Sequence, residues 1–315
     1  MLLFRKITKS IIEKPTFALL ILICLSCQTQ NDQSEAADFF LRGNLLVQNK
    51  EFEKAVKMYN EALEKKPDFV DALNNKGMAY LKLNNAEEAL IAFEKALSIE
   101  PNYTPALFNR SEALFLSKDY KQCISDLEEV KKTYKDTFYV YTSLGNAFVK
   151  LNQQNLAFEN YNKAIALNPK SEESYINRGV LNFEKNNLEA AIKDYKKAIE
   201  LNPNNANALN NLGLALIKIK DYNNALLVID KSLTFDAGNP FYINNKAFLM
   251  LKLNKNDEAQ KLAEKSLRID DTNPYAYRNL GIAFFNKKDF KNAKLNLEKA
   301  LALKSDIEET REYLK

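Results

Sequence analysis

Residues 172–205 read EESYINRGVLNFEKNNLEAAIKDYKKAIELNPNN, and this 34-residue segment shows the pattern on which the whole chain is built. The same pattern recurs every 34 residues in eight copies, without insertion or deletion. The copies are 36–69, 70–103, 104–137, 138–171, 172–205, 206–239, 240–273 and 274–307. A fixed period of this length predicts stacked structural units that share one continuous apolar core.

Small residues recur at fixed positions of the repeat. The eighth position is glycine in six copies, and the twentieth and twenty-seventh are mostly alanine. The glycines are Gly43, Gly77, Gly145, Gly179, Gly213 and Gly281. Helix axes about 8 to 10 Å apart leave little room for a side chain where they cross. These positions therefore predict close helix contacts, with the larger residues of the fourth and twenty-fourth positions facing them.

The ends of the second helix of each repeat are also marked. Proline stands at position 32 in four copies, where it would end that helix; these are Pro67, Pro101, Pro169 and Pro203. Position 16 is Asn or Asp in five copies and is predicted to cap the start of the same helix; these are Asn85, Asp119, Asn187, Asp221 and Asp289. Each repeat is therefore predicted to be a helix-turn-helix.

This pattern resembles the tetratricopeptide repeat over residues 36–307. The resemblance implies an all-α fold, an α-solenoid of eight 34-residue helix-turn-helix repeats that form a right-handed superhelix. Their first helices would line a concave face. The last apolar face of such a solenoid needs a cover, and Tyr313 and Leu314 provide apolar side chains near the end of the chain. We therefore expect residues 308–315 to form a C-terminal capping helix.

The beginning of the chain has the pattern of a secretion signal. Basic residues between Arg5 and Lys14 precede an apolar run, 16–26, that ends at Cys27. The run has eleven residues, whereas a membrane-spanning helix needs about 20. Ser26 followed by Cys27 resembles the cleavage site of bacterial lipoproteins, which predicts a signal peptide at 1–26 and acylation of Cys27. An ordinary cleaved signal is the alternative.

The expected location follows from this signal. Residues 27–35 would be the lipidated cysteine and a flexible polar tether, and several acyl chains would hold the protein on a membrane. Gln28, where an Asp would favour the inner membrane, favours the outer membrane by resemblance to bacterial sorting rules. We therefore expect a lipid-anchored protein of the bacterial cell envelope, on the outer membrane and facing the periplasm.

Composition argues against several classes of function. The chain has no His and no Trp, so mechanisms that need an imidazole base or a His metal ligand are excluded. Removal of the signal leaves a net charge of +1, without the basic footprint of nucleic-acid binding. Cys123 is in an alanine position and is predicted to be a buried small residue. We expect no metal, no cofactor and no catalytic residues.

Function is therefore expected on the concave face. Position 6 of the first helix is Asn in six of the eight repeats: Asn75, Asn109, Asn177, Asn211, Asn245 and Asn279. A carboxamide both donates and accepts, so each could bond the backbone of an extended peptide. Inheritance of a common repeat residue explains the same row of asparagines without a ligand, and the sequence leaves the two explanations open.

Apolar residues join these asparagines at other positions of the concave face. They are Tyr139, Phe241 and Tyr275 at position 2 and Phe248 and Ile282 at position 9. Exposed apolar side chains in a groove are typical of a binding surface. Chaperone-binding relatives hold acidic C-terminal tails with basic residues at positions 2, 5 and 6. Only Arg278 is basic there, so that mode of binding is not favoured.

Three functions remain after these exclusions. The first is a membrane-anchored scaffold or adaptor that binds a protein or peptide segment in its groove and serves envelope or secretion-complex assembly. The second is a regulator that docks a cell-wall enzyme or its substrate. The third, an enzyme, is disfavoured because adjacent acids such as Asp270 and Asp271 are better explained as solvated charges than as an acid-base pair.

Overall fold

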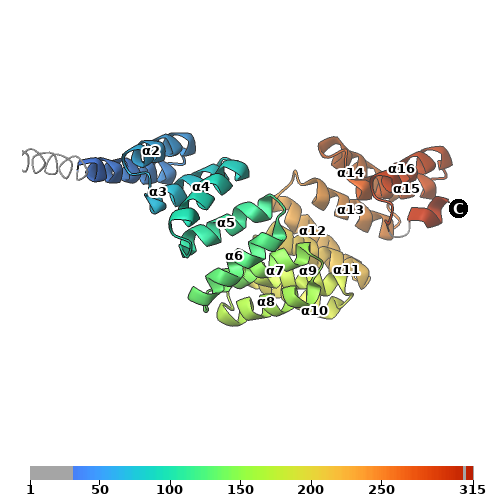
Figure 1. Ribbon diagram of the computed structural model, residues 1–315. Helices are drawn as coiled ribbons and strands as arrows, with labels where there is room; N and C mark the ends of the chain where they lie inside the picture. Colours follow the sequence, from blue (N-terminus) through green and yellow to red (C-terminus); the bar gives the residue numbers. More distant parts are fainter. Residues whose placement is uncertain (1–30, 308–309, 315) are drawn as a thin grey trace, which may run out of the picture. The chain divides into compact units, whose positions relative to one another are not determined.

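The computed structural model describes residues 31–307 and 310–314, and this part of the chain contains α-helices and no strand. Residues 31–48 are helical, and fifteen further α-helices follow in the chain order shown in Figure 1. They are α2 (Phe52–Lys65), α3 (Val70–Lys82), α4 (Ala86–Ile99), α5 (Thr104–Leu116), α6 (Tyr120–Thr133), α7 (Phe138–Lys150), α8 (Gln154–Leu167), α9 (Glu172–Glu184), α10 (Leu188–Leu201), α11 (Ala206–Lys218), α12 (Tyr222–Phe235), α13 (Pro240–Lys252), α14 (Asn256–Ile269), α15 (Pro274–Asn286) and α16 (Phe290–Leu303). The predicted all-α solenoid of paired helices is confirmed.

The two helices of a repeat meet at the predicted small residue. A Cβ atom on Gly213 of α11 would lie 2.4 Å from Cγ1 of Ile229 in α12, and one on Gly179 would lie 2.6 Å from Cε1 of Tyr195. Non-bonded carbon atoms prefer about 3.5 to 4.0 Å. The glycine at position 8 therefore makes room for the large residue at position 24, and the predicted register of the repeat is confirmed.

Most of the predicted helix caps are present. The Asp119 carboxylate accepts a hydrogen bond from the Gln122 amide at 3.1 Å, and Asn85, Asp221 and Asp289 cap their helices in the same way. Asn187 stands at the N-cap of α10 but makes no side-chain cap bond. The prediction is therefore wrong for the Asn187 side chain and correct for the place where that helix begins.

The turn between the two helices has a feature that the sequence analysis missed. In all eight repeats, the residue immediately before the N-cap of the second helix has a positive φ, between 57° and 65°. These residues are Lys50, Asn84, Lys118, Asn152, Asn186, Lys220, Asn254 and Lys288. Asparagine tolerates this left-handed conformation better than most residues. The repeated Asn at position 15 was the signal that could have located the turn.

The described residues divide into two compact units, with the boundary between Asn152 and Gln153. The boundary falls inside the repeat 138–171, between α7 and α8. Within each unit, neighbouring helices along the chain pack against each other. The apolar core of the second unit includes Ile229, Leu249 and Leu297, all fully buried. The sequence predicted one array over 36–307 and did not indicate this division.

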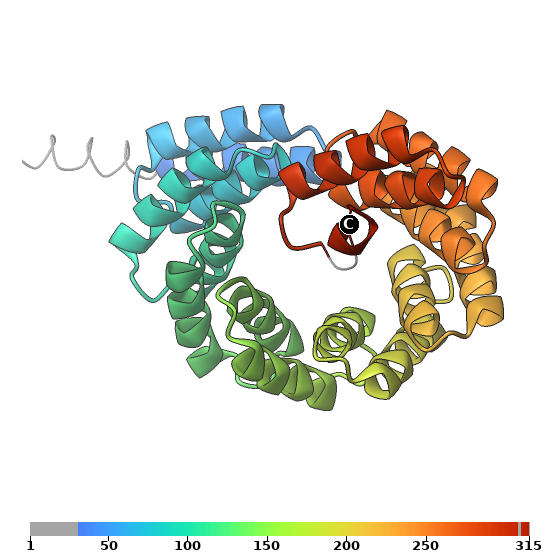
Figure 2. The same ribbon diagram turned by 90° about the vertical axis from the view of Figure 1, so that its right-hand side faces the viewer.

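The two ends of the repeat array differ from the expected tether and cap. Residues 31–35 were assigned to a flexible tether and are helical instead; Glu35 forms an ion pair with Lys65 of α2. The predicted signal and Cys27 lie outside the described residues. At the other end, residues 310–314 form a short 3-10 helix, η1, that turns back under α15 and α16 (Figure 2). Its Tyr313 ring lies 5.2 Å from that of Phe285.

Candidate functional site

A groove of about 750 Å³ lies in the second unit, along the first helices α11, α13 and α15 of the last three repeats. Half of the predicted site residues line it: Asn211, Asn245, Phe241, Phe248, Tyr275 and Arg278. They come from three stacked repeats because a position repeated every 34 residues faces the same side of each first helix. The structure thus brings together the residues that the sequence predicted for the C-terminal half of the concave face.

The other predicted residues lie elsewhere. Asn75, Asn109 and Tyr139 belong to the first unit, and Asn177 is on α9, outside the lining of the groove. Ile282 is 4% exposed and packs in the core of the second unit. Asn279 is fully buried. Because a buried side chain cannot reach a ligand in the groove, we leave Ile282 and Asn279 out of the binding surface.

Several of the repeated asparagines join neighbouring repeats to each other. The Asn245 amide nitrogen donates to Oδ1 of Asn210 at 3.0 Å, and the Asn109 nitrogen donates to Oδ1 of Asn74 at 2.9 Å. In both cases position 6 of one repeat donates to an asparagine at position 5 of the repeat before it. The accepting residues Asn74 and Asn210 are buried, and a buried carboxamide oxygen without a partner would be costly. These bonds therefore have a structural role of their own.

Asn75 makes the same kind of bond to a different partner. Position 5 of the first repeat is Phe40, which has no acceptor, and Asn75 donates to Oδ1 of Asn44 at 2.8 Å. The Tyr59 hydroxyl donates to the same oxygen at 2.7 Å. Burial raises the pKa of Tyr59 to about 12. The phenol therefore stays protonated near neutral pH and serves as a hydrogen-bond donor to Asn44, together with Asn75.

Asn211 differs from these asparagines. Position 5 of the preceding repeat is Ile176, an apolar side chain, so the usual acceptor is missing. Within the described part of the chain, no hydrogen bond involves the Asn211 side chain, which is half-buried and lines the groove. A carboxamide in this setting has a donor and an acceptor to offer to the backbone of a bound segment. Asn211 is therefore the member of the row best placed to contact a ligand.

Arg278 is held between two aromatic rings of the groove. Its guanidinium carbon lies 4.9 Å from the ring centre of Phe248 and 5.5 Å from that of Tyr275. Its Nε and Nη2 donate to Oδ1 of Asn279 at 3.2 and 3.0 Å. Asn279 in turn donates to Oδ1 of Asn244 at 2.8 Å. The buried Asn279 thus orients a cation at the groove wall.

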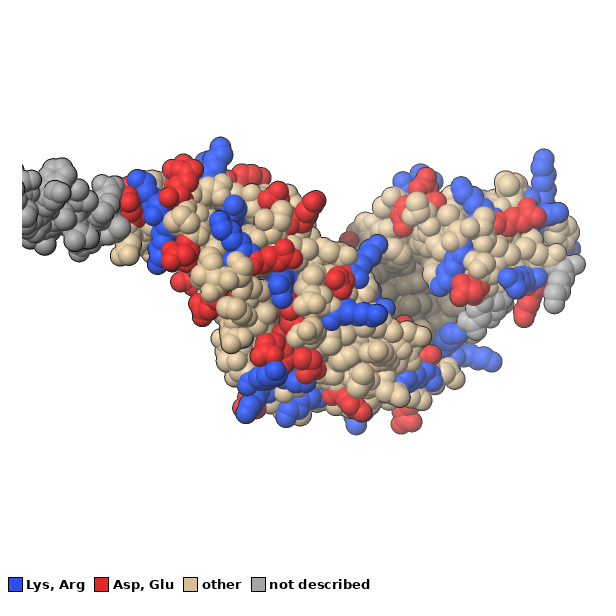
Figure 3. Space-filling model, in the orientation of Figure 1, with Lys and Arg blue, Asp and Glu red and all other residues tan. Residues whose placement is uncertain are grey.

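Three lysines also line the groove, Lys218, Lys220 and Lys252, and no described residue of its lining is acidic. Elsewhere Lys and Arg alternate with Asp and Glu, as Figure 3 shows for one face. The basic clamp of chaperone-binding relatives uses positions 2, 5 and 6, whereas these lysines are at positions 13 and 15. A count of charges that included position 13 would have found Lys218 and Lys252, but not Lys220, which lies in the turn after α11.

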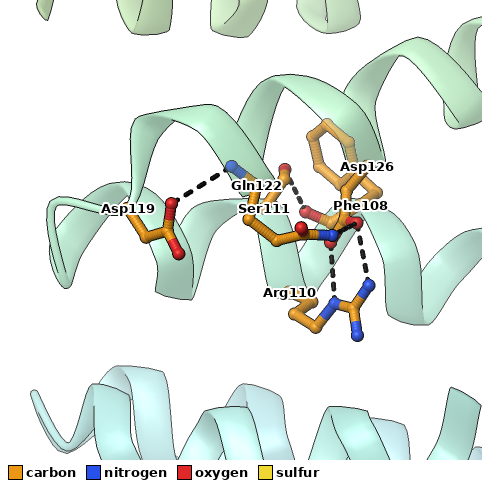
Figure 4. Close-up of polar contacts among 6 residues, drawn as sticks. All are labelled: Phe108, Arg110, Ser111, Asp119, Gln122 and Asp126. Carbon is orange, nitrogen blue, oxygen red and sulfur yellow. Dashed lines mark hydrogen bonds and ion pairs between the residues drawn. The ribbon is translucent and has the colours of Figure 1, made fainter.

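The sequence analysis also missed two ion pairs that join the helices of a repeat. Arg110 of α5 contacts Asp126 of α6 through Nε and Nη2 at 2.7 and 2.8 Å, and Gln122 donates to the same carboxylate (Figure 4). Arg178 and Asp194 repeat this arrangement at 2.9 and 2.6 Å. Asp126 is 3% exposed. Both acids are paired with arginine, so removal of either partner would leave a buried charge uncompensated. An acid held in this way is a poor candidate for acid-base chemistry.

Cys123 is buried and occupies the position of the second helix that the other seven repeats fill with alanine. Cys123 is 2% exposed, and burial raises the pKa of its thiol to about 12. A protonated, inaccessible thiol is a poor nucleophile. The described residues contain no cluster of three potential metal-binding Cys, Asp or Glu side chains, and none of their helices is long and apolar enough to cross a bilayer.

Comparison with known proteins agrees with this architecture. Models of the tetratricopeptide repeat match residues 40–104, 206–239 and 274–307, and a TPR repeat model matches 145–185 and 181–220. A TPR repeat-containing protein of Methanocaldococcus jannaschii is 26% identical over 167 residues, which are 48% of this chain and 29% of that protein. The chain therefore spans less than a third of this relative.

Solved structures show the same fold. The APC/C hetero-tetramer Cut9–Hcn1 contains a chain with a TM-score of 0.68 and 23% identity, matched over 78% of this chain and 48% of its own. A tetratricopeptide repeat protein from Parabacteroides merdae has a TM-score of 0.65 and 15% identity over 80% and 99% of the two chains. Together, the matched repeats and the paired helices of the structure show that this chain belongs to the tetratricopeptide repeat family.

Proposed function

We propose that this protein is a membrane-anchored scaffold or adaptor that holds an extended segment of a protein partner in the groove along α11, α13 and α15. Repeat proteins of this family act in protein–protein interaction. The single observation that carries the proposal is the groove itself, where the Asn211 side chain has no hydrogen bond to another described residue and Phe241 is 54% exposed.

An extended segment suits this groove because its lining repeats along the stack. Each first helix presents the same face to the groove, so a segment that runs along the stack meets the same set of repeat positions in one repeat after another. Asn211 would exchange hydrogen bonds with the backbone of the segment, each worth about 0.5 to 1.5 kcal/mol. Phe241 would bury an apolar side chain, which contributes about 25 cal/mol per Å² removed from water.

The membrane anchor is the second part of the proposal. The apolar run before Cys27 supports a lipoprotein signal, and acylation of Cys27 would attach the repeats to the bacterial envelope, on the outer membrane. There the protein would serve envelope or secretion-complex assembly. A regulator that docks a cell-wall enzyme is the alternative, and it would use the same groove and anchor with a different partner.

Cross-linking in native envelope membranes tests the groove. Wild type is compared with Asn211→Ala/Phe241→Ala, and bound proteins are identified by mass spectrometry. Leu227→Ala is the matched control, because Leu227 is 68% exposed on the second helix α12. We expect the groove variant to lose a partner that both wild type and control retain. Equal capture by all three proteins would contradict groove binding.

Labelling of cells with a radioactive fatty acid tests the anchor separately. Wild type should incorporate the label and fractionate with membranes, whereas Cys27→Ser should do neither. Incorporation by the Cys27→Ser protein would overturn the assignment of this residue. The identity of the captured protein then separates the two candidate roles, since an assembly component supports the scaffold and a cell-wall enzyme supports the regulator.

A further inference from the structure

A cavity of about 300 Å³ lies in the first unit, separate from the groove of the second unit. Its walls come mainly from the first helices α5 and α7 of two successive repeats. Phe108, Phe115 and Leu116 of α5 supply apolar surface, and Glu112 of α5 and Ser143 of α7 supply polar atoms. The proposed function makes no use of this cavity.

The cavity lies where the repeat pattern changes to a smaller side chain. Position 6 is Asn in six repeats, but in the repeat 138–171 it is Ser143, which fills less space. Position 5 of the preceding repeat is Phe108, whose side chain offers no hydrogen-bond acceptor. Within the described residues, the Ser143 side chain makes no hydrogen bond. Its hydroxyl is therefore available to a ligand in the cavity.

Glu112 brings the one charged side chain among the described residues that line this cavity. It is exposed, and no Lys or Arg of the described chain forms an ion pair with it. Other acids of the same unit are paired, as Asp126 is with Arg110 and Glu128 is with Lys131. An uncompensated carboxylate beside an apolar wall attracts a cation.

Two aromatic rings of the lining suit the same kind of ligand. The Phe108 ring meets that of Tyr139 edge-on, with centres 5.1 Å apart, and the Phe115 ring meets that of Tyr120 in the same way at 5.4 Å. No cation of the described chain lies over the Phe108 or Phe115 ring. Aromatic faces attract ammonium and guanidinium groups, so the rings and Glu112 favour the same charge.

We propose that this cavity binds a basic side chain, Lys or Arg, of a protein partner. The aliphatic part of that side chain packs against Phe115 and Leu116, and its charged end pairs with Glu112 and donates to the Ser143 hydroxyl. The apolar surface beside the cavity favours a polypeptide over a free cation, because Leu116 is 55% and Tyr139 is 43% exposed. A polypeptide segment would cover this surface, whereas a small cation would leave it in water.

Four synthetic peptides test this specificity with the full chain in detergent. Each has roughly nine residues, about 30 Å when extended, and they differ only at the middle residue. It is Arg, Lys, Leu or citrulline, the neutral counterpart of Arg. A benzophenone beside the middle residue cross-links the bound peptide under light, and mass spectrometry maps and quantifies the labelled positions. The peptides are used below saturation, so that labelling is proportional to occupancy.

We expect the Arg and Lys peptides to label residues around the cavity roughly fivefold more than the citrulline and Leu peptides. Glu112→Gln should remove this advantage. Ser143→Asn should also reduce it, because it partly fills the cavity with the residue that six other repeats carry at this position. The matched control, Glu87→Gln, removes an exposed carboxylate from the second helix α4 and should keep the advantage.

Several outcomes would overturn the inference. Equal labelling by the Arg and citrulline peptides would exclude recognition of the charge, and equal effects of Glu112→Gln and Glu87→Gln would exclude Glu112 as its partner. Full protection by ethylguanidinium at the concentration of the peptide would assign the cavity to a free cation. The groove variant Asn211→Ala/Phe241→Ala should leave labelling of the cavity unchanged, so this test is independent of the proposed function.

Discussion

The side-chain nitrogen of Asn279 in α15 donates a hydrogen bond to Oδ1 of Asn244 in α13 at 2.8 Å, across 35 positions of the chain. Asn279 is fully buried and Asn244 is 4% exposed. The bond therefore joins two repeats in a place that water cannot reach. Asn279 also accepts hydrogen bonds from Arg278. The contact between Asn279 and Asn244 therefore also positions the Arg278 guanidinium in the groove.

Replacement of Asn279 by Ala should destabilise the protein. The change leaves the buried Asn244 oxygen without this donor, at a cost of about 1 to 3 kcal/mol. Asn211→Ala is the matched control, because the two asparagines occupy the same position of the repeat and Asn211 makes no such bond. It should change the free energy of unfolding by less than about 0.5 kcal/mol. Urea denaturation measures both, and equal losses would refute the distinction between them.

Gly213→Leu should disrupt the contact between α11 and α12. A Cβ atom there would lie 2.4 Å from Ile229, and overpacking of a core typically costs about 1 to 3 kcal/mol. Gly238 has no atom within 4 Å of its own Cβ position, so Gly238→Leu is the control and should melt like wild type. Thermal melts followed by circular dichroism compare the variants. An unchanged melting curve for Gly213→Leu would count against the close approach of these helices.

Arg110→Met should leave Asp126 buried without its charge partner. Breaking a buried pair by removal of one partner costs about 3 to 5 kcal/mol, whereas replacement of both by apolar residues is often nearly neutral. The double variant Arg110→Met/Asp126→Leu should therefore recover most of the stability that the single variant loses. Chemical denaturation of both variants checks this. If the double variant were less stable than the single one, the pair would have another role.

Cys123 should react slowly with thiol reagents while the protein is folded. Burial raises its pKa to about 12, so the thiol stays protonated at pH 8, where a free cysteine with a pKa near 8.5 is partly ionised. The test uses a protein with Cys24→Ser and Cys27→Ser, measured with a coloured disulfide reagent before and after unfolding. Rapid modification of the folded protein would show that the thiol is accessible.

The raised pKa of Cys123 also predicts how the stability of the protein changes at alkaline pH. The unfolded chain loses the Cys123 proton above about pH 8.5, whereas the folded chain keeps it to about pH 12. The folded state then binds more protons than the unfolded state, so stability falls as the pH rises through this window. Cys123→Ala removes this contribution. Its free energy of unfolding should fall less steeply than that of wild type between about pH 8.5 and 10.

For the six asparagines at position 6, the sequence predicted a shared helix face but not the role of each residue. The period placed all six on the same face of their helices, and it could not assign separate roles to them. The Asn245 side chain donates to Asn210, whereas Ile176 stands at the corresponding position before Asn211, and no described residue accepts a hydrogen bond from the Asn211 side chain. The difference depends on the residue at position 5 of the preceding repeat. It becomes visible only when neighbouring first helices are seen packed together.

The position of Lys218 and Lys252 in the groove also could not be predicted from the sequence. Both end their helices, where a lysine is a common and uninformative residue because it favours the negative end of the helix dipole. Their contribution to one groove depends on how α11 and α13 stack, which also places Arg278 against Phe248 of the neighbouring repeat. No local pattern around either lysine contains this information.

The sequence alone determined the helix pairs, their period and the register in which small residues meet large ones. These follow from steric rules that act within one repeat and are repeated eight times, so each copy reinforces the same conclusion. Which polar side chains connect neighbouring repeats, and where the array divides, became visible only in the packed structure. Those features depend on side chains from successive repeats, and their burial and pairing are set when the helices pack.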